Sequence, residues 1–388
     1  MSYKNYIIKI KKITPILTEF QSDTVFGHLS WAVKYLYGDG RLLDFLEASK
    51  TGEPPFICSN AFPQDYLPYP VLSVDLSDSA KNEINTIFDE EKVPLKNRKV
   101  VFKALKDKSY IHKSLLTLYK HGINSLALTR GIFKGEICPE LMKPINNFDG
   151  AKKSGCAGFN KCVLFKDYKD SSDGCDSFEV NKCPAVEEKK MFARKKDIWR
   201  NAINRISMTV EKGKLFSCEY DFYDKCAVLD LYVKISDFFS EEDIKKLFDY
   251  ISKTGFGADA STGCGAFDFD IKEIPAADIK PDGSNAFISL SNYSPRASDP
   301  ASGDYKVFTK YPKISAALGH KNPFKAPVIL IKPGAVFKLP QNNPANEFYG
   351  RMITGLTPFI KNDLNIDIVQ CGLTYPYFIK LIEQNSKK

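Results

Sequence analysis

The sequence predicts an α+β fold composed of two ferredoxin-like domains. Two observations lead to this fold class. Segments 5–13 and 226–235 alternate between apolar and polar residues like strands, and each is followed by a segment with helical periodicity. Strand–helix–strand units therefore occur twice along the chain, which is the pattern of split βαβ folds. We place the domains at 1–215 and 216–388, with an insertion at about 149–190 in the first.

The first domain begins with a strand and a helix. Ile and Lys alternate in 5–13 (NYIIKIKKI), which predicts the strand. Apolar residues at helical spacing in 26–37 predict a helix that Gly38 and Gly40 end, and a second short helix is expected at 42–48. The remaining expected elements are an extended, proline-rich stretch at 54–70, a basic stretch at 78–121 that is helical or irregular, and a helix at 192–208.

The second domain repeats this order. Residues 226–235 (CAVLDLYVKI) alternate like a strand, and Ser240 with Asp243 has the spacing of a capping box at the start of a helix. A glycine-rich segment, 255–265, follows that helix. Further strands are expected at 266–274, 285–291, 327–332 and 366–381.

Composition indicates a globular chain with a modest excess of positive charge. The 388 residues include 43% hydrophobic and 26% charged residues, and the net charge is +8. Basic runs near 92–108 and 189–200 suit either phosphate contacts or solvated helix faces. No apolar run reaches membrane-spanning length, and Lys4 and Lys9 interrupt the first residues before an apolar segment can form. We therefore expect no membrane span, no secretory signal and a cytoplasmic location.

The most informative stretch is GFGADASTGCGAF, residues 255–267. It is not a P-loop, because neither Lys-Ser nor Lys-Thr follows Gly263, and it is not a dinucleotide fingerprint, because its glycines follow a helix and precede a strand. Phosphate binding would therefore come from backbone N–H groups of the loop together with the hydroxyls of Ser261 and Thr262. The alternative is a tight helix-to-strand turn that needs glycine only for its geometry.

This loop resembles the glycine-rich loop of the RAMP superfamily, the RNA-binding proteins of CRISPR effector complexes, and in particular that of the fourth subunit of the type III-A Csm complex. Four further segments carry the resemblance in order, FGHLSWAVKYLYG (26–38), PPFICSNAFPQDYLPYP (54–70), RNAINRISMTVEKGKLF (200–216) and SLSNYSP (289–295). The resemblance covers most of the chain outside 78–190. It implies two RRM-like domains packed into one unit. It also implies a ribonucleoprotein subunit of antiviral defence that caps the crRNA 5′ handle and contacts the large polymerase/cyclase-type subunit and the first backbone RAMP subunit.

The matching motifs supply the candidate RNA-binding residues. These are His28, Asn204, Arg205, Gly255, Phe256, Gly257, Ser261, Thr262, Gly263 and Gly265. Arg205 suits a phosphate or the face of a base, unless Glu211 or Glu219 pairs with it, and an exposed Phe256 suits base stacking. Lys9, Lys11 and Lys12 either follow the RNA backbone or solvate a sheet edge. The chain departs from the family pattern at Cys264, where a basic residue is common, and in its greater length.

Two other functions remain open from the sequence. RAMP relatives that process guide RNA use a histidine as general acid or base, so His28 allows a metal-independent endoribonuclease. The other alternative is a protein-only scaffold in which the glycine-rich loop is a packing turn. The chain has four histidines and no dense carboxylate cluster, so we predict a non-catalytic subunit with no catalytic residues.

The insertion carries a group of cysteines, Cys156, Cys162, Cys175 and Cys183. Four thiolates can hold a tetrahedral structural zinc and order a segment that lacks a core of its own. The spacing is not that of common zinc ribbons, so free thiols are the alternative. No other cofactor is expected.

Overall fold

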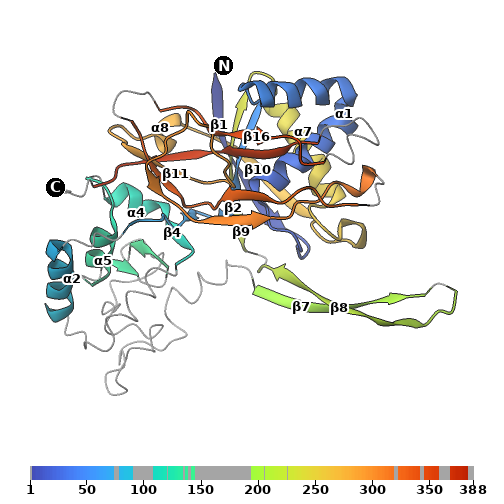
Figure 1. Cartoon of the computed structure of the whole chain (residues 1–388), viewed down its shortest axis with the longest axis horizontal. Coiled ribbons are helices and arrows are strands. Elements are labelled where there is room, and N and C mark those ends of the chain that lie inside the picture. Colours follow the sequence, from blue (N-terminus) through green and yellow to red (C-terminus); the bar gives the residue numbers. More distant parts are fainter. Residues whose placement is uncertain are drawn as a thin grey trace. The chain divides into compact units, whose positions relative to one another are not determined.

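The computed structural model describes residues 2–73, 78–90, 108–119, 121–133, 136–138, 141–144, 194–204, 206–224, 226–318, 322–340, 345–357 and 368–382. The chain is α+β, as predicted, and its described strand ladders are antiparallel (Figure 1). It divides into unit 1, formed by Met1–Gln64 and Lys190–Ile274, and unit 2, formed by Asp65–Lys189 and Pro275–Lys388. Each unit is thus assembled from two stretches of chain, whereas the sequence-based division at 215/216 expected consecutive domains.

Unit 1 holds a four-stranded sheet with strand order β10-β1-β9-β2. Its elements are β1 (Tyr3–Lys12), α1 (Ser22–Thr51), β2 (Phe56–Pro63), β7 (Arg194–Ile203), β8 (Val210–Phe222), β9 (Val228–Ser236), α7 (Glu241–Thr254), a 3-10 turn (Ala260–Thr262) and β10 (Phe267–Ile274). The two strand–helix–strand segments that we assigned to separate domains therefore join in one sheet. Strand β1 is an interior strand, so the expectation that its lysines solvate a sheet edge is wrong.

Helices α1 and α7 pack against each other and against this sheet, where α1 contacts β2 and α7 contacts β10 (Figure 1). The capping box of α7 is confirmed, because the Asp243 N–H donates to Ser240 Oγ over 3.1 Å and the Ser240 N–H donates to Asp243 Oδ2 over 3.0 Å. Helix α1 is kinked at Gly38, where φ is 86°, so the predicted interruption occurs but the helix resumes directly after it. Apolar residues of both helices face the sheet and form the core of unit 1.

The predicted helix at 192–208 is wrong. Arg194–Ile203 forms β7, which pairs with β8 as a two-stranded antiparallel hairpin. Opposite charges face each other near its base, where Lys195 Nζ lies 2.7 Å from Glu219 Oε1. Cross-strand pairing of this kind outweighs the helix propensity of the lysines and arginines in the segment.

Unit 2 contains a second four-stranded sheet, with strand order β12-β15-β11-β18. Its elements are β3 (Tyr66–Pro68), α2 (Asp78–Glu90), β4 (Tyr110–His112), α4 (Lys113–Leu118), α5 (Ser125–Phe133), β5 (Ile137–Cys138), β6 (Lys143–Pro144), α8 (Ala276–Ile279), β11 (Ala286–Ser289), β12 (Gly303–Asp304), β13 (Val307–Lys310), a 3-10 turn (Ala316–Leu318), β14 (Val328–Ile331), β15 (Val336–Lys338), β16 (Tyr349–Ile353), β17 (Gln370–Thr374) and β18 (Pro376–Ile379). Strands were expected at 285–291, 327–332 and 366–381, and β11, β14, β17 and β18 lie there.

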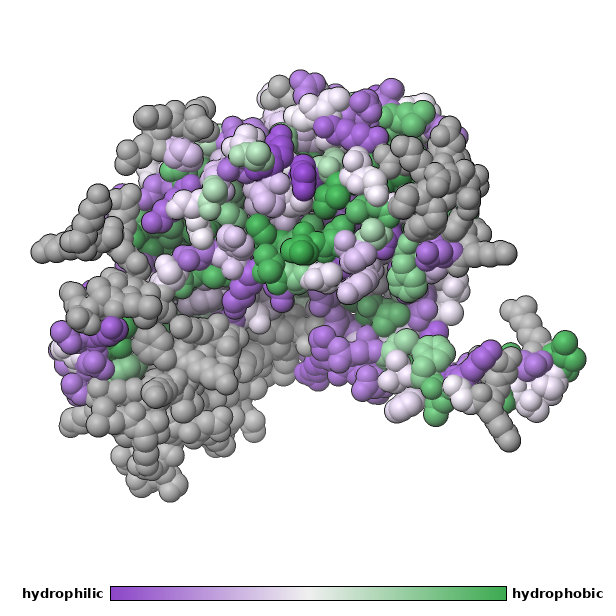
Figure 2. Space-filling model, viewed as in Figure 1, coloured by the Kyte–Doolittle hydropathy of each residue, from purple (hydrophilic) through white to green (hydrophobic). Residues whose placement is uncertain are grey.

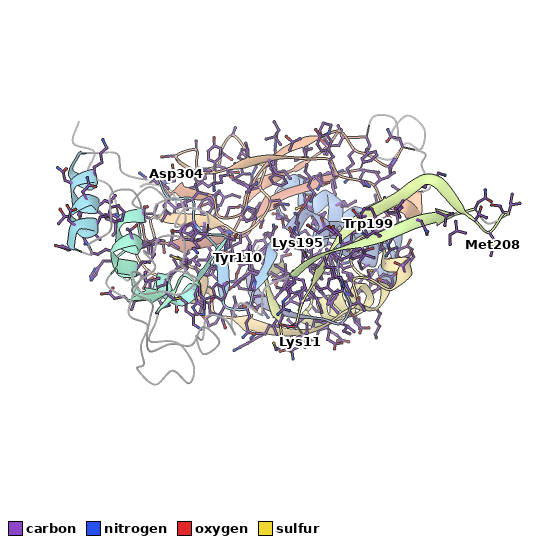
Figure 3. All side chains as sticks on the ribbon, turned by 90° about the horizontal axis from the view of Figure 1, so that it is seen from below. Lys11, Tyr110, Lys195, Trp199, Met208 and Asp304 are labelled. Atoms are coloured by element: carbon purple, nitrogen blue, oxygen red, sulfur yellow. The ribbon has the colours of Figure 1, made fainter. Side chains whose placement is uncertain are left out.

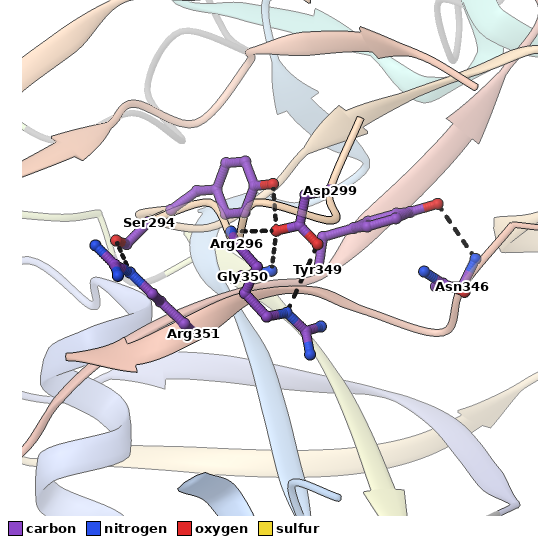
Figure 4. A network of polar contacts seen from close by, with 8 residues as sticks. Ser294, Arg296, Asp299, Asn346, Tyr349, Gly350 and Arg351 are labelled. Carbon is purple, nitrogen blue, oxygen red and sulfur yellow. Dashed lines mark hydrogen bonds and ion pairs between the residues drawn. The ribbon is translucent and has the colours of Figure 1, made fainter. Parts of the chain in front are cut away.

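A buried carboxylate organises the segment after β11 (Figure 4). Asp299 Oδ2 accepts hydrogen bonds from the Tyr293 hydroxyl at 2.9 Å and from the N–H groups of Arg296 and Gly350, each at 2.8 Å. Burial, followed by the neighbouring Asp299 charge, raises the pKa of Tyr293 well above its ordinary value. The SLSNYSP motif at 289–295 thus contributes to a polar structural network that joins β11 to β16. Among the described helices, none is long and apolar enough to cross a membrane.

Candidate nucleic-acid interface

The glycine-rich loop of unit 1 connects α7 to β10 through backbone conformations that favour glycine. Helix α7 ends at Gly255, whose N–H donates to the Ile251 carbonyl over 3.0 Å. The φ angles of Gly255, Gly257, Gly263 and Gly265 are 87°, 84°, 88° and 79°. All four lie in the left-handed region, where a side chain is strained. The geometry explains why four glycines occur here, because one C-cap needs only one.

The two ends of the loop touch each other, and we call this part the loop root (Gly255, Phe256, Gly257 and Gly265). The Phe256 N–H donates to the Gly265 carbonyl over 2.9 Å. A Cβ added to Gly265 would lie 2.1 Å from the Phe256 carbonyl oxygen, and one added to Gly255 would lie 2.8 Å from the Cys264 carbonyl oxygen. Only glycine permits this approach of backbone to backbone.

The segment between β1 and α1 anchors the loop root. Thr14 Oγ1 accepts from the Ala266 N–H at 2.9 Å, and Thr18 Oγ1 accepts from the Ala258 N–H at 3.1 Å. The Pro15 carbonyl accepts from the Gly265 N–H at 3.0 Å. Most amide groups of the loop are therefore satisfied within the protein, which limits the backbone phosphate binding that the sequence suggested.

The expectation of an exposed Phe256 is wrong. Its side chain is 1% exposed, and its ring stacks on Phe20 with centroids 4.1 Å apart and an interplanar angle of 15°. The His28 ring lies 4.5 Å from the Phe256 ring centroid. Burying this aromatic ring stabilises unit 1. The position of Phe256 between two flexible glycines had instead suggested an exposed side chain. In this conformation the ring does not present a face for a base.

His28 supports the same ring and the same loop. Its Nε2 accepts a hydrogen bond from the Gly257 N–H at 3.0 Å, so the proton of the neutral ring lies on Nδ1. Burial lowers the pKa of His28 to about 4. A neutral imidazole whose Nε2 already accepts a backbone hydrogen bond is suited to holding the loop and poorly suited to transferring protons near pH 7.

Three further residues of the loop, Ser261, Thr262 and Gly263, are exposed, and we call them the loop tip. The Thr262 hydroxyl donates to the Asp259 carbonyl over 2.9 Å, whereas the Ser261 hydroxyl makes no hydrogen bond within the described part of the chain. A Cβ at Gly263 would meet no atom within 4 Å. The tip thus has free space around it, although the φ angle of Gly263 favours glycine and the N–H groups of Thr262 and Gly263 already donate to the Asp259 and Ala260 carbonyls, each over 3.0 Å.

A salt bridge links the loop to the β7–β8 hairpin. The Arg200 guanidinium lies 3.2 Å from Asp259 Oδ2, and the Tyr220 hydroxyl donates to the same oxygen. Burial, together with this hydrogen bond, raises the pKa of Tyr220 to about 12. Arg200 thus offsets the charge of Asp259, the only carboxylate of the loop. The sequence alone did not connect Arg200, Tyr220 and Asp259, because they are far apart in the chain.

The hairpin itself carries two predicted contact residues near its turn. Asn204 Oδ1 accepts from the N–H groups of Ile206 and Ser207 at 2.9 and 3.2 Å, so its side chain shapes the turn. Arg205 lies outside the described residues. Apolar side chains are exposed along the hairpin and at its far end, with Trp199, Ile206 and Met208 exposed by 67%, 96% and 78% (Figures 2 and 3).

The four insertion cysteines, Cys156, Cys162, Cys175 and Cys183, also lie outside the described residues. Within the part of the chain that the structure describes, no cluster of three or more histidine, cysteine or acidic residues can hold a metal ion. The structure thus brings His28 together with the loop root, places Ser261, Thr262 and Gly263 at the exposed tip, and puts Asn204 in a separate hairpin turn.

Comparison with solved structures identifies the fold. A chain of the Csm3–Csm4 subcomplex of the type III-A CRISPR-Cas interference complex aligns with a TM-score of 0.55 and 13% identity, covering 98% of this chain and 100% of that one. A chain of the Csm1–Csm4 cassette in complex with pppApA gives a TM-score of 0.49 and 15% identity over the same shares. A chain of the type III-B Cmr-beta complex bound to cognate target RNA and AMPPnP gives 0.39 and 11%, with 86% of each chain covered.

No protein-family model and no curated protein matches the sequence. The structural similarity therefore extends over nearly the whole chain at an identity that establishes the fold and nothing finer. The predicted resemblance to the Csm complex is confirmed at that level. The chain shares the fold of a protein from the type III-A CRISPR-Cas interference complex.

Proposed function

We propose that this chain is a non-catalytic RNA-binding subunit of a type III-A CRISPR (Csm) effector complex, where it caps the crRNA 5′ handle. The observation that carries the proposal is the fold shared with a chain of the Csm3–Csm4 subcomplex over 98% of this chain and 100% of that one. The preformed glycine-rich loop with an exposed tip supports it, because such a loop can approach a nucleic-acid backbone closely.

Unit 1 supplies the ferredoxin-like part of the proposal. Its sheet order β10-β1-β9-β2, with α1 between β1 and β2 and α7 between β9 and β10, is the arrangement of a split βαβ domain. RRM domains, which bind RNA, contain a four-stranded sheet as well. The second ferredoxin-like domain of the sequence prediction would then correspond to unit 2.

The geometry of the loop supports a smaller set of proposed RNA contacts. Gly255, Phe256, Gly257 and Gly265 form the buried or anchored root, so their role is to hold the loop in place. We therefore assign the contacts to the tip, where the Ser261 hydroxyl is exposed and the space around Gly263 is open. Arg200 lies beside the loop with its side chain 30% exposed, and its pairing with Asp259 offsets the carboxylate charge that would otherwise repel a phosphate.

The proposal assigns no catalytic role to His28. A histidine that acts as acid or base at neutral pH needs a pKa near 7 and a nitrogen within reach of the reacting group. His28 has a pKa of about 4, and its Nε2 accepts a hydrogen bond from the Gly257 N–H. These two properties favour a structural histidine over the endoribonuclease alternative.

The same structural similarity supports a proposal for the partners of this chain. The solved complexes contain Csm1 or Csm3 beside Csm4, so we expect this chain to contact the large subunit and the first backbone subunit. The exposed apolar side chains of the β7–β8 hairpin, among them Trp199 and Met208, are suited to being covered in such an assembly. The proposed cellular location is the cytoplasm.

A matched pair of glycine variants tests the RNA-binding loop. Gly263 and Gly283 both have positive φ angles, 88° and 74°, and a Cβ at either would meet no atom within 4 Å. Each Gly→Ala change should therefore cost about 1 kcal/mol of stability. Only Gly263→Ala places a methyl group where the RNA backbone would approach, so we expect at least a roughly tenfold loss of affinity for handle-bearing RNA.

The measurement is titration of the full chain with crRNA that carries an intact or a permuted handle. Equal affinity of the Gly263→Ala and Gly283→Ala variants would remove the loop tip from the proposed interface. Purification of the tagged chain from its host should also yield a large complex with short RNAs that share one 5′ end. A small species without RNA would instead support the scaffold alternative.

The structural zinc proposed for Cys156, Cys162, Cys175 and Cys183 has its own test. Metal analysis of the purified chain at neutral pH would find about one zinc per chain if the four thiolates bind it. Thiol titration under native conditions separates the two alternatives, because free thiols react and zinc thiolates are protected.

A further inference from the structure

The β13–β14 hairpin of unit 2 lies in a part of the chain whose charge is almost entirely positive. Residues 304–332 contain six lysines and a single carboxylate, Asp304, in a protein whose total net charge is +8. Strand β13 pairs with β14 from Val307↔Ile331 to Lys310↔Val328. Of these lysines, Lys310 lies in β13, and Lys306 and Lys332 lie at the ends of the paired strands.

Two lysines on this hairpin face each other directly. Lys306 and Lys332 continue the ladder, with the Lys332 N–H donating to the Lys306 carbonyl over 2.8 Å. Both are exposed, and neither has a carboxylate partner within the described part of the chain. Like charges opposite each other on paired strands destabilise a sheet. Such an arrangement indicates a surface that meets negative charge from outside the protein.

The lysines stand beside aromatic rings. Lys313 pairs with Phe324 in an isolated bridge, and its Nζ lies 5.1 Å from the centroid of the Phe324 ring. Lys332 Nζ lies 5.9 Å from the Phe308 ring centroid. Each of these cations is thus placed next to a flat π surface, the combination that single-strand-binding proteins use for phosphates and bases.

Several rings on this hairpin point away from the core. Tyr305, Tyr311 and Phe324 are exposed by 50%, 69% and 46%. One side of the hairpin packs on the core, because Phe308 contacts a buried cluster that includes Val328 and Leu330. The alternation along the ladder puts Lys306 and Lys332 on this same side, where both remain exposed. Tyr305 also stacks on the buried Phe337, with centroids 5.8 Å apart, so the rings of Tyr311 and Phe324 are the more accessible ones.

An exposed aromatic surface on unit 1 provides the contrast. Trp31, Tyr35 and Tyr250 form a row of rings on α1 and α7 with neighbouring centroids 5.6 and 6.0 Å apart. The lysines of those helices are paired with carboxylates, Lys34–Asp39 at 2.9 Å, Lys246–Glu242 at 3.0 Å and Lys253–Asp249 at 2.7 Å. Protein interfaces are depleted in lysine and enriched in aromatics, which suits that surface and not the β13–β14 hairpin.

We propose that the β13–β14 hairpin, together with the neighbouring Tyr311, Lys313 and Phe324, binds single-stranded RNA. The residues involved are Tyr305, Lys306, Tyr311, Lys313, Phe324 and Lys332. The lysines would contact successive phosphates, and the exposed rings would stack on bases without reading their sequence. This site is in unit 2 and has no residue in common with the glycine-rich loop, so it adds a second RNA contact to the proposed function.

The salt dependence of binding tests the proposal with a matched control. The first variant of the full chain carries Lys306→Gln and Lys332→Gln. The control carries Lys245→Gln and Lys253→Gln, which removes the same charge from lysines that each have a carboxylate four residues away. The probe is a single-stranded RNA of twelve uridines without a handle, titrated at several KCl concentrations.

The expected result is a loss of affinity in the first variant alone, with the slope of log affinity against log salt falling by about 1.4, or about 0.7 per lost phosphate contact. Ultraviolet crosslinking of the unmodified chain should place the RNA on peptides within 304–332. Equal slopes for the two variants, or crosslinks only elsewhere, would overturn the proposal. Urea unfolding confirms that both variants fold, and we expect the first to be no less stable than the unmodified chain.

The two RNA-binding proposals can be disproved independently of each other. If only the handle-binding proposal is wrong, Gly263→Ala leaves binding of handle-bearing RNA unchanged while the Lys306/Lys332 variant still loses uridine binding. If only the hairpin proposal is wrong, the loop variant loses preference for the intact handle and the lysine variants bind alike.

Discussion

The glycine-rich loop of unit 1 and the β13–β14 hairpin of unit 2 are built in opposite ways. The loop is fixed by short contacts, since a Cβ at Gly265 would lie 2.1 Å from the Phe256 carbonyl oxygen and the nearby Arg200 is already paired with Asp259. The hairpin has exposed lysines, among them Lys306 and Lys332, without carboxylate partners in the described part of the chain. One surface is defined by backbone shape and the other by charge.

This difference predicts two kinds of recognition. A surface defined by backbone shape depends on the geometry of the bound strand and weakly on salt, because few counterions are released. A surface defined by free lysines gains affinity for any single strand and loses it as salt rises. If both bind RNA, the loop gives the subunit its preference for one RNA end, and the hairpin adds affinity without sequence.

The largest effect is expected at the loop root. In Gly265→Ala, the added methyl group would overlap the Phe256 carbonyl, and φ of 79° would be strained as well. We expect a loss of about 4 kcal/mol in the free energy of unfolding, or failure of unit 1 to fold, because backbone atoms cannot move aside cheaply. Urea unfolding followed by circular dichroism measures it.

The tip variant Gly263→Ala is the control for this effect. Its φ of 88° carries a similar backbone strain, but its Cβ meets no atom. The loss should therefore stay near 1 kcal/mol. Similar losses at Gly265 and Gly263 would contradict the division of the loop into an anchored root and an open tip.

A second prediction concerns the pH dependence of the root. Burial lowers the pKa of His28 to about 4, whereas an unfolded histidine has a pKa near 6.5. Between these values the unfolded state binds the additional proton, so stability is full above pH 6.5 and falls as pH decreases toward 4. The contribution of this one group amounts to at most about 3 kcal/mol.

His28→Gln isolates that contribution. The glutamine carbonyl can still accept from the Gly257 N–H, but it does not titrate. Between pH 7.5 and 4.5 the unmodified chain should lose more stability than the variant, by urea unfolding at each pH. The same acid sensitivity in both proteins would show that His28 is not buried and neutral as described.

Local signals in the sequence predicted strands β1 and β9 and helix α7 of unit 1. The alternation in 5–13 and 226–235 corresponds to β1 and β9, and the Ser240–Asp243 spacing marks the start of α7. These elements are encoded by neighbouring residues, namely period-two alternation and a capping box that is satisfied within one turn. The coarse α+β class follows from them directly.

Properties that depend on distant residues were not predictable in this way. Arg194–Ile203 forms a hairpin strand because Val210–Phe222 pairs with it, and charged residues alone resemble an exposed helix. Phe256 is buried because Phe20, which lies between β1 and α1 in the sequence, stacks on it. The two strand–helix–strand segments join in one sheet, which only the pairing of β1 with β9 and β10 reveals.

The smallest of these effects is expected at Lys12, where β1 ends beside the loop root. Its Nζ is buried, has no hydrogen-bond acceptor in the described part of the chain and lies 3.1 Å from the Tyr223 ring centroid. Burial lowers its pKa to about 6, against the opposing attraction of Asp221. The folded state therefore binds fewer protons than the unfolded state between pH 6 and 10.5, and stability rises with pH across that range.

Lys12→Met keeps the length of the side chain and removes the buried amine. We expect the variant to be more stable than the unmodified chain by about 2 kcal/mol at pH 7.5, with the advantage shrinking toward pH 9.5 as the unfolded lysine also loses its proton. Urea unfolding at the two pH values measures the difference. A variant that is less stable at pH 7.5 would mean that the Lys12 amine is charged and bound by a partner. The structure around the loop root would then depend on a buried charge. The contrast between a loop defined by backbone shape and a hairpin defined by charge would no longer hold.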